Sequence, residues 1–217
     1  MAGRRIDNWR TLFERAVRII DSCRAAGIPE PTWSFGGGTV LMRRYRHRIS
    51  RDVDIFIGDP QYLTAFSPRL NDVAEALTEN YVEDARFLKL RFEEGEIDFI
   101  VGRYLSDQPT VQEEIIGRPV LVETPREIIA KKVFHRAADF TARVLFDFAL
   151  VIEKERPGLM ANAGTFRDKR DALVGQLDKS EATLREDFEA LDVLEYRPSF
   201  GRSMKTVRDF LRALGAG

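Results

Sequence analysis

The sequence predicts an α/β (α+β) protein, in which a mixed β-sheet flanked by helices is followed by a helical C-terminal region. Apolar and polar residues alternate at 52–57, as in a half-buried strand. Apolar residues in 7–26 recur at the three- and four-residue spacing of an amphipathic helix. From Thr124 to the C-terminus the patterns are helical. We therefore predict an α/β domain over 1–123 and a helical domain over 124–217.

The composition is that of a soluble globular protein, with 44% hydrophobic and 32% charged residues among 217. The formal net charge of -1 gives no indication of a polyanionic partner. Cys23 is the only cysteine, which excludes an intramolecular disulfide and a cysteine-based zinc cluster. No apolar segment approaches the roughly 18 residues of a membrane span, and residues 1–10 lack the apolar segment of a secretory signal. We therefore expect a cytoplasmic location and no membrane partner.

The first predicted elements are a helix, a short strand and a second helix. The helix over 7–26 ends at Gly27 and Pro29, because both residue types disfavour continuation of a helix. A strand is expected at 32–35, and three glycines follow it. The second helix is predicted over 39–47.

The clearest strand prediction covers 52–57, with the sequence DVDIFI. Neighbouring side chains of a strand point to opposite sides of the sheet, so the three aliphatic residues share one face. The other face carries Asp52, Asp54 and Phe56. A helix is then predicted at 69–80, and further strands are predicted at 87–92, 96–101 and 119–123.

The helical region is predicted to begin at Thr124. Thr124 would be the N-cap and Pro125 the first helical residue. Glu127 stands three residues after the N-cap, which is the spacing of a capping box.

Two features around the 52–57 strand indicate a phosphate and metal site. The glycines directly before Thr39 allow the backbone to approach a phosphate closely, with the amides of a helix N-terminus facing the anion. Asp52 and Asp54 point the same way, so both carboxylates can bind a divalent cation together with nucleotide phosphate oxygens. Oxygen ligands of this kind suit Mg²⁺ or Mn²⁺.

Asp98 is the third candidate carboxylate. It lies on a strand that can pair beside 52–57, where it would help to bind a second metal and to deprotonate an attacking hydroxyl. Each feature has an ordinary explanation by itself, because glycine triplets are often turns and exposed aspartates are often solvated. The occurrence of all of them in this order is more specific.

Residues 43–51 hold five arginines in nine positions. This run is either a solvated helix end and loop or a surface that faces phosphate. Its position directly before Asp52 favours the second interpretation.

The segments GGT and HRISRDVDIFI resemble the pattern of the nucleotidyltransferase superfamily, and within it the AbiEii/AbiGii toxin family of type IV toxin–antitoxin systems and its solitary relatives. A second segment, PREIIAKKVFHRAADFTARVLFDFALVIE, is similar to the helical part of that family, with its lysine and its ARDLFD-like motif. The two segments span positions 36 to 153. No motif is recognised beyond residue 160.

The resemblance implies a nucleotidyltransferase-type sheet and assigns roles by position. The catalytic and metal-binding residues would be Asp52, Asp54 and Asp98. The nucleotide-binding residues would be Gly37, Gly38, Thr39, Arg48, Ser50, Lys131, Lys132, Arg143 and Asp147. Arg143 and Asp147 are four residues apart, so a local ion pair along a helix is the alternative for them.

The implied function is the Mg²⁺- or Mn²⁺-dependent transfer of NMP from an NTP to an acceptor hydroxyl. By resemblance the acceptor is RNA, such as the 3′ end of a tRNA, and a hydroxyl on a protein or a small molecule is the alternative. A cognate antitoxin protein is an implied partner. Val144 departs from the family motif, which has an aspartate there, and it favours a second hypothesis. In that hypothesis the chain is a catalytically impaired nucleotide-binding or protein-interaction module of the same fold.

Overall fold

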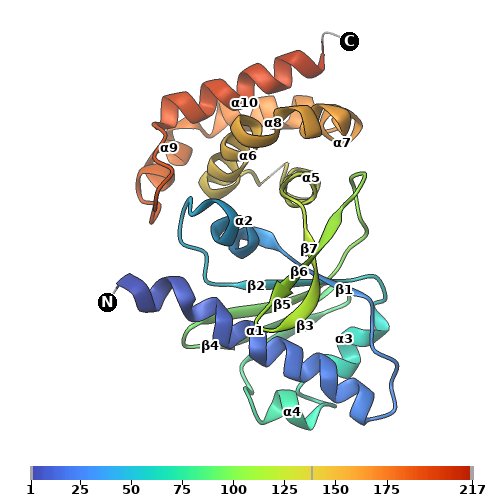
Figure 1. Cartoon of the computed structure of the whole chain (residues 1–217). Helices are drawn as coiled ribbons and strands as arrows, with labels where there is room; N and C mark the ends of the chain where they lie inside the picture. The colour runs from blue at the N-terminus through green and yellow to red at the C-terminus, as the bar shows by residue number, and fades with distance from the viewer. Residues whose placement is uncertain (1, 138, 216–217) are drawn as a thin grey trace. The chain divides into compact units, whose positions relative to one another are not determined.

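Helix α1 (Ala2–Ala25) lies along the β-sheet and covers part of one face, as Figure 1 shows. The apolar stripe predicted from the sequence is buried, including Trp9, Leu12 and Phe13. The rings of Trp9 and Phe13 pack against Phe35 of the sheet, with ring centroids 6.0 and 5.0 Å away. The predicted helix is therefore confirmed, and it forms the hydrophobic core of this part of the chain together with the sheet.

The computed structural model describes residues 2–137 and 139–215. Within it the chain divides into two units. The first unit comprises Met1–Val40, Ile49–Arg103 and Thr110–Glu123. The second unit comprises Leu41–Arg48, Tyr104–Pro109 and Thr124–Gly217. Helix α2 (Gly37–Tyr45) begins in the first unit and ends in the second.

The described part of the first unit is built around a seven-stranded mixed sheet with the order β3-β4-β5-β2-β1-β7-β6. The strands are β1 (Trp33–Gly36), β2 (Val53–Ile57), β3 (Tyr81–Asp84), β4 (Phe87–Phe92), β5 (Gly95–Val101), β6 (Thr110–Ile115) and β7 (Arg118–Glu123). Strand β2 lies at the centre, antiparallel to β1 and parallel to β5. Its residues Val53, Ile55 and Ile57 are buried, which confirms the predicted alternation. The mixed sheet with flanking helices confirms the predicted fold class.

The prediction of one helix over 69–80 is wrong. The short helix α4 (Asp72–Glu75) covers only part of this range, and another short helix, α3 (Gln61–Phe66), precedes it. Asn71 is the N-cap of α4, because its side-chain oxygen accepts hydrogen bonds from the backbone N–H groups of Val73 and Ala74. The chain then enters β3 at Tyr81 and pairs with β4. Leu70, which the helical pattern placed in the core, is 66% exposed. Pairing of β3 with β4 therefore overrides the local helical periodicity.

The described part of the second unit is helical. Its helices are α5 (Pro125–Arg136), α6 (Ala142–Ala161), α7 (Ala163–Arg167), α8 (Arg170–Lys179), α9 (Glu181–Glu189) and α10 (Phe200–Leu214). Helix α6 is central, because α5, α9 and α10 all pack against it. A cluster of aromatic rings from Phe148, Phe166 and Phe210 joins α6, α7 and α10. Among the described residues, each helix is either too short or too polar to be a membrane span.

The start of α5 agrees with the prediction in position but not in its capping. Thr124 is the N-cap and Pro125 follows it, but the Thr124 side chain makes no capping hydrogen bond. The buried carboxylate of Glu127 accepts hydrogen bonds from the N–H groups of Leu105 and Ser106 at 2.9–3.1 Å. The predicted capping box is therefore wrong, because Glu127 anchors the 104–109 segment instead.

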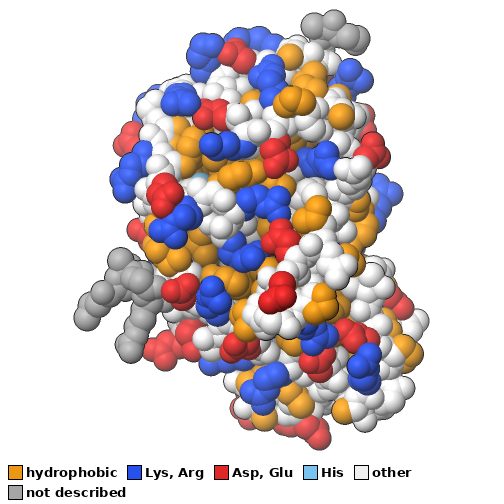
Figure 2. Space-filling model, in the orientation of Figure 1, with side chains coloured by type: hydrophobic (Ala, Val, Ile, Leu, Met, Phe, Trp, Pro, Cys, Tyr) orange, Lys and Arg blue, Asp and Glu red, His pale blue; other side chains and the backbone are white. Residues whose placement is uncertain are grey.

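Charged side chains are distributed without strong segregation on the face shown in Figure 2. Lys and Arg side chains alternate with Asp and Glu, in keeping with the formal net charge of -1.

Candidate active site

The candidate site begins with a pair of aspartates on neighbouring strands. Strands β2 and β5 run parallel, and Asp54 is the direct register partner of Asp98. Register partners on adjacent strands lie about 4.8 Å apart across the ladder and direct their side chains to the same face. The prediction that the strand carrying Asp98 pairs beside the strand carrying Asp54 is thus confirmed.

Asp52 is held at the entrance to β2 by two contacts. Its carboxylate accepts a hydrogen bond from the backbone N–H of Glu96 at 3.3 Å, so it lies beside the start of β5. Its backbone carbonyl accepts a hydrogen bond from the hydroxyl of Thr39 in α2. The Thr39 side chain, predicted to cradle phosphate, is buried and fixes the backbone of Asp52. The predicted phosphate contact of Thr39 would therefore have to use its backbone N–H.

Asp98 is a largely buried carboxylate with one oxygen paired. Its Oδ2 accepts a hydrogen bond from the ammonium of Lys89 at 3.1 Å, and Lys89 also contacts Glu96. Its Oδ1 is buried and has no hydrogen-bond partner among the described residues. Burial raises the pKa of Asp98, and the negative charges of Glu96 and Asp52 add to this, while Lys89 opposes it. The result is a pKa above the ordinary aspartate value.

The turn between β1 and α2 approaches Asp54 closely. Gly36 is the register partner of Asp54, and Gly37 begins α2 with a φ of +73°. A Cβ added to Gly37 would lie only 2.5 Å from Cγ of Asp54, so no other residue fits without movement. Gly38 and Thr39 follow in the first helical turn, where backbone N–H groups have no intrahelical acceptor. The glycine motif therefore places helix N–H donors next to an aspartate of the pair.

Gly37→Ala is expected to lower the free energy of unfolding more than Gly117→Ala does. Gly117 has the same φ of +73°, but a Cβ there meets nothing within 4 Å. Both variants incur the cost of a left-handed L-residue, about 1–2 kcal/mol. Only Gly37→Ala also collides with Asp54, and overpacking of this kind costs about 1–3 kcal/mol. Urea denaturation of the two variants measures the difference, and equal midpoints would contradict the close approach.

Glu123 is a further buried carboxylate at the site, and it was not predicted from the sequence. It ends β7, its side chain is fully buried, and it accepts a hydrogen bond from the hydroxyl of Ser34 at 3.1 Å. The apolar run VLV directly before it predicts a buried strand end, and this was the available signal. Its nearness to Gly36 depends on the pairing of β7 with β1, which the sequence does not show.

The donor chemistry of the site fits a divalent cation. Asp52, Asp54 and Asp98 supply hard oxygen ligands, and the buried Oδ1 of Asp98 is available as a further acceptor. Among the described residues, no group of three or more His, Cys, Asp or Glu side chains is arranged as a complete metal site. Mg²⁺ is usually held by one or two carboxylates together with substrate phosphates, so a pair of carboxylates is sufficient for this ion.

The predicted nucleotide-binding residues fall in both units. Those of the first unit are Gly37, Gly38, Thr39 and Ser50. Those of the second unit are Arg48, Lys131, Lys132, Arg143 and Asp147. Their roles toward a nucleotide remain predictions. The contacts of the second group are set by a buried cluster around Asp147.

Asp147 on α6 is fully buried and is the centre of an ionic cluster. Arg48 donates to both of its oxygens at 2.7 Å, and His47 Nε2 lies 2.9 Å from Oδ1. The ammonium of Lys132 also contacts Asp147 and is 16% exposed. Asp147 thus pairs with residues distant in sequence, whereas Arg143, one turn earlier on α6, is exposed.

Other predicted positions in the second unit have local partners. Lys131 is buried and lies 3.6 Å from the carboxylate of Glu127. Its ammonium also lies 5.2 Å from the ring centre of Tyr104.

Val144 is fully buried on the core side of α6. An aspartate at this position would require a partner inside an apolar environment.

Charges around Asp147 determine its ionisation and that of His47. Burial raises the pKa of Asp147, but Arg48, Lys132 and His47 together bring it well below the ordinary value. Burial lowers the pKa of His47 by more than the hydrogen bond to Asp147 raises it. At neutral pH the cluster therefore holds an ionised Asp147 and a neutral His47.

The depressed pKa of His47 predicts a loss of stability in mild acid. The unfolded chain takes up the proton at about pH 6.5, above the pKa of His47 in the folded state. The contribution of neutral His47 to the free energy of unfolding is therefore complete above about pH 6.5. It declines as the pH falls towards the folded-state pKa of His47. Asp147 does not titrate in this range, since its contribution is lost only below about pH 3.9 as the pH falls towards its depressed pKa.

His47→Gln is expected to flatten the fall in unfolding free energy between about pH 6.5 and 5. The matched control is His135→Gln, since His135 is the only other histidine and is exposed. Urea denaturation at several pH values measures the slope. A His135→Gln variant with the flatter slope would show that the buried histidine is not the group responsible.

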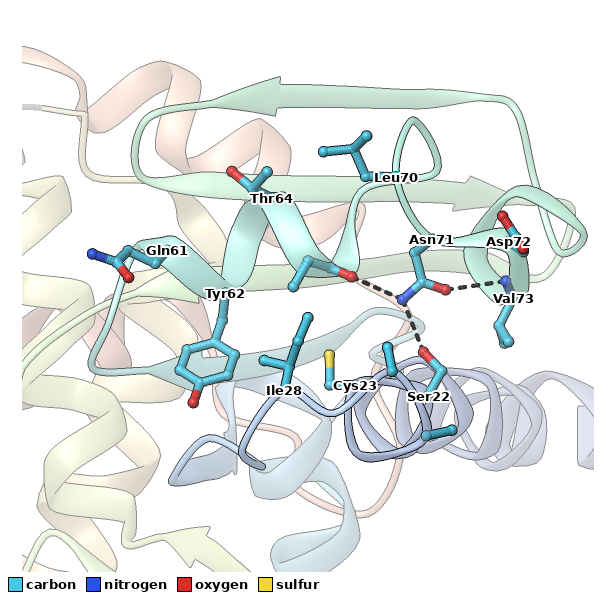
Figure 3. A pocket seen from close by; sticks show the side chains of 13 residues that line it. Ser22, Cys23, Ile28, Gln61, Tyr62, Thr64, Leu70, Asn71, Asp72 and Val73 are labelled. Atoms are coloured by element: carbon cyan, nitrogen blue, oxygen red, sulfur yellow. Dashed lines mark hydrogen bonds between the residues drawn. The ribbon is translucent and has the colours of Figure 1, made fainter.

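A separate cavity of about 640 Å³ lies between the C-terminal turns of α1 and the short helices α3 and α4 (Figure 3). The side-chain amide of Asn71 projects towards α1 and donates to Ser22 Oγ and to the Ala65 carbonyl, both at 2.8 Å. Its oxygen accepts from the N–H groups at the start of α4. The cavity wall contains none of the three candidate aspartates. We therefore place the candidate active site at the aspartate pair.

Solved structures that are similar to this chain include proteins described as nucleotidyltransferases. A candidate nucleotidyltransferase from H. pylori has a TM-score of 0.52 at 13% identity, covering 93% of this chain and 92% of that one. The antibiotic-resistance factor ANT(2'')-Ia also has a TM-score of 0.52, at 16% identity, over 79% of this chain and 97% of that one. The nucleotidyltransferase toxin MenT4 from Mycobacterium tuberculosis H37Rv has a TM-score of 0.50 at 18% identity, over 86% and 76% of the two chains. At these identities the likeness shows the fold.

The sequence itself establishes the family. No curated protein matches it significantly. The family described as the nucleotidyl transferase AbiEii toxin of type IV toxin–antitoxin systems matches residues 18–214, which is most of the chain. The match includes the glycine turn, Asp52, Asp54, Asp98 and the helices of the second unit. The chain therefore belongs to the AbiEii nucleotidyltransferase toxin family.

Proposed function

We propose that the protein transfers a nucleotidyl group from a nucleoside triphosphate to an acceptor hydroxyl in a metal-dependent reaction. The observation that carries the proposal is the position of Asp54, which lies between the glycine turn at Gly37 and the carboxylate of Asp98. Helix N–H donors that suit phosphate and carboxylates that suit a cation thus meet on one face of the sheet. Membership of the AbiEii family supports the reaction class.

Each residue has a role that follows from its contacts. Asp52 and Asp54 would hold Mg²⁺ or Mn²⁺, which neutralises phosphate charge and polarises the phosphorus centre when bound. The N–H groups of Gly37, Gly38 and Thr39 would bind phosphate oxygens at the start of α2. Oδ1 of Asp98 would accept the proton of the attacking hydroxyl, because it is buried and has no other described partner.

The proposed transfer occurs in one displacement and needs no covalent enzyme intermediate. The acceptor oxygen forms a bond to the α-phosphorus while the bond from that phosphorus to the bridging oxygen of the β-phosphate breaks. Pyrophosphate leaves, and the proton of the acceptor passes through Asp98 to solvent. Positioning and charge neutralisation by the chain therefore supply the catalysis.

The acceptor we favour is RNA, such as the 3′ end of a tRNA, in keeping with the toxin description of the family. A hydroxyl on a protein or on a small molecule is the alternative. The family description also supports a cognate antitoxin protein as a partner.

The test is an incubation of the protein with Mg²⁺, each α-labelled nucleoside triphosphate and total RNA. Label on RNA that disappears when the metal is chelated would establish the proposed reaction and identify the nucleotide. Label on protein would retain the transfer reaction and replace the RNA acceptor. Absence of transfer to RNA, to protein and to small-molecule hydroxyl acceptors would contradict the enzyme hypothesis.

The second candidate is a nucleotide-binding or protein-interaction module that has lost transfer activity. Val144 favours it, because an apolar residue fully buried in α6 replaces the aspartate of the family motif. Thermal unfolding with and without Mg-ATP separates the two candidates when combined with the labelling test. Stabilisation by Mg-ATP without any transfer would support the binding module, and transfer by the wild-type chain would exclude it.

A further inference from the structure

Glu123 lies beside the glycine turn although it is distant from it in sequence. Strands β7 and β1 run parallel, with Phe35 opposite Val122, so the next residues, Gly36 and Glu123, end their strands side by side. Ser34, which is buried, donates its hydroxyl to Oε1 of Glu123 at 3.1 Å. The carboxylate is therefore fixed in direction by a neighbour two residues before the turn.

The other side of that carboxylate lies against the glycine backbone. A Cβ added to Gly36 would lie 2.7 Å from Cδ of Glu123 and 2.7 Å from the ring of Phe56. The adjacent Gly37 is bounded in the same way by Asp54, whose Cγ would lie 2.5 Å from an added Cβ. The two glycines are thus enclosed by a carboxylate on each side. Of these two carboxylates, only that of Asp54 belongs to a predicted metal-binding residue.

We propose that Glu123 is a positioning residue for the triphosphate of the nucleotide. The inference rests on the proposed function and extends it to a residue outside the predicted set. By packing against Gly36, Glu123 fixes the direction in which the N–H groups of Gly37 and the next residues leave the turn. Those N–H groups have no intrahelical acceptor, so their direction decides how well they receive phosphate oxygens.

The packing of Glu123 against Gly36 predicts which property of its side chain matters. Glutamine has almost the same shape, and its side-chain oxygen can accept the hydrogen bond from Ser34. Alanine leaves an empty volume next to Gly36 and removes the acceptor of Ser34. If Glu123 acts by its shape, Gln therefore preserves its function and Ala does not. If Glu123 acts by its charge, neither substitution preserves the function.

The experiment measures binding of Mg-tripolyphosphate, the group shared by all nucleoside triphosphates, by isothermal titration calorimetry. We expect the Kd to rise about tenfold in Glu123→Ala, since small misplacements of binding groups have effects of this order or more. Glu123→Gln should remain within about threefold of wild type by the same reasoning. Glu114→Ala is the matched control, because Glu114 is exposed on β6 of the same hairpin. Its Kd should equal that of wild type.

Several results would overturn the inference. They are absence of tripolyphosphate binding by wild type, an unchanged Kd in Glu123→Ala, and an equal loss in the Gln and Ala variants. If Glu123→Ala does not fold, Ser34→Ala decides, because it removes only the hydrogen bond to Oε1. A raised Kd in Ser34→Ala at an unchanged Tm supports positioning, and an unchanged Kd refutes it.

The binding readout separates this inference from the proposed function. Tripolyphosphate binding that depends on Glu123, in a protein without transfer activity, would support the positioning role and refute the enzyme. Transfer activity with an unchanged KM for the nucleotide in Glu123→Ala would establish the enzyme and refute the positioning role.

Discussion

Asp54→Asn is expected to lower kcat for nucleotidyl transfer by at least about a hundredfold, the order seen when one charge-stabilising group is removed from an active site. The substitution removes a negative charge and leaves the side-chain volume almost unchanged. The packing of residue 54 against Gly37 therefore remains, and so does the pairing of β2 with β5. The affinity for the divalent cation should fall together with kcat, so the loss should be partly reversed at high Mg²⁺ concentration.

The control for this prediction is Asp84→Asn. Asp84 ends β3 at the edge of the same sheet and is exposed, so the same chemical change occurs away from the glycine turn. It should retain wild-type kcat and Mg²⁺ dependence. Thermal unfolding of both variants shows whether either change reflects loss of fold. A folded Asp54→Asn protein with activity within threefold of wild type would remove Asp54 from the catalytic residues.

The sequence predicted the central strands of the sheet because their local patterns agree with their tertiary environment. The alternation in DVDIFI places Asp54 opposite the buried aliphatic face, and the structure has the same arrangement. The pairing of Asp54 with Asp98 was also predictable, since both lie on apolar strands with a carboxylate at the same face. In these segments periodicity, burial and charge all indicate one structure.

Features that depend on pairing between distant segments were not predictable in this way. Strands β3 (YVED) and β6 (TVQEEI) are polar edge strands, so they have little apolar alternation to reveal them. Glu123 could be recognised as a buried strand end but not as a neighbour of Gly36, because that contact requires the parallel pairing of β1 with β7. The local pair considered for Asp147 failed for the same reason: its partners come from segments 15 or more residues away.

Asp147→Asn is expected to lower the free energy of unfolding of the second unit by about 3–5 kcal/mol, the usual cost of breaking a buried ion pair from one side. Arg48 is buried and donates to both carboxylate oxygens, and Lys132 contacts the same group. An asparagine leaves these two cations without a neutralising charge and offers one acceptor oxygen in place of two. Urea denaturation followed by circular dichroism, which reports mainly on helices, measures the loss.

The size of this loss distinguishes a buried ionic cluster from an ordinary surface pair. Asp178 on α8 pairs with Arg208 at 2.8 Å, but its side chain is 56% exposed. Asp178→Asn should therefore cost less than about 1 kcal/mol, because water replaces the lost interaction. Equal effects of the two substitutions would mean that water reaches Arg48 and Lys132 in the variant. A loss confined to Asp147→Asn would show that one carboxylate holds segment 41–48 and helices α5 and α6 together through its charge.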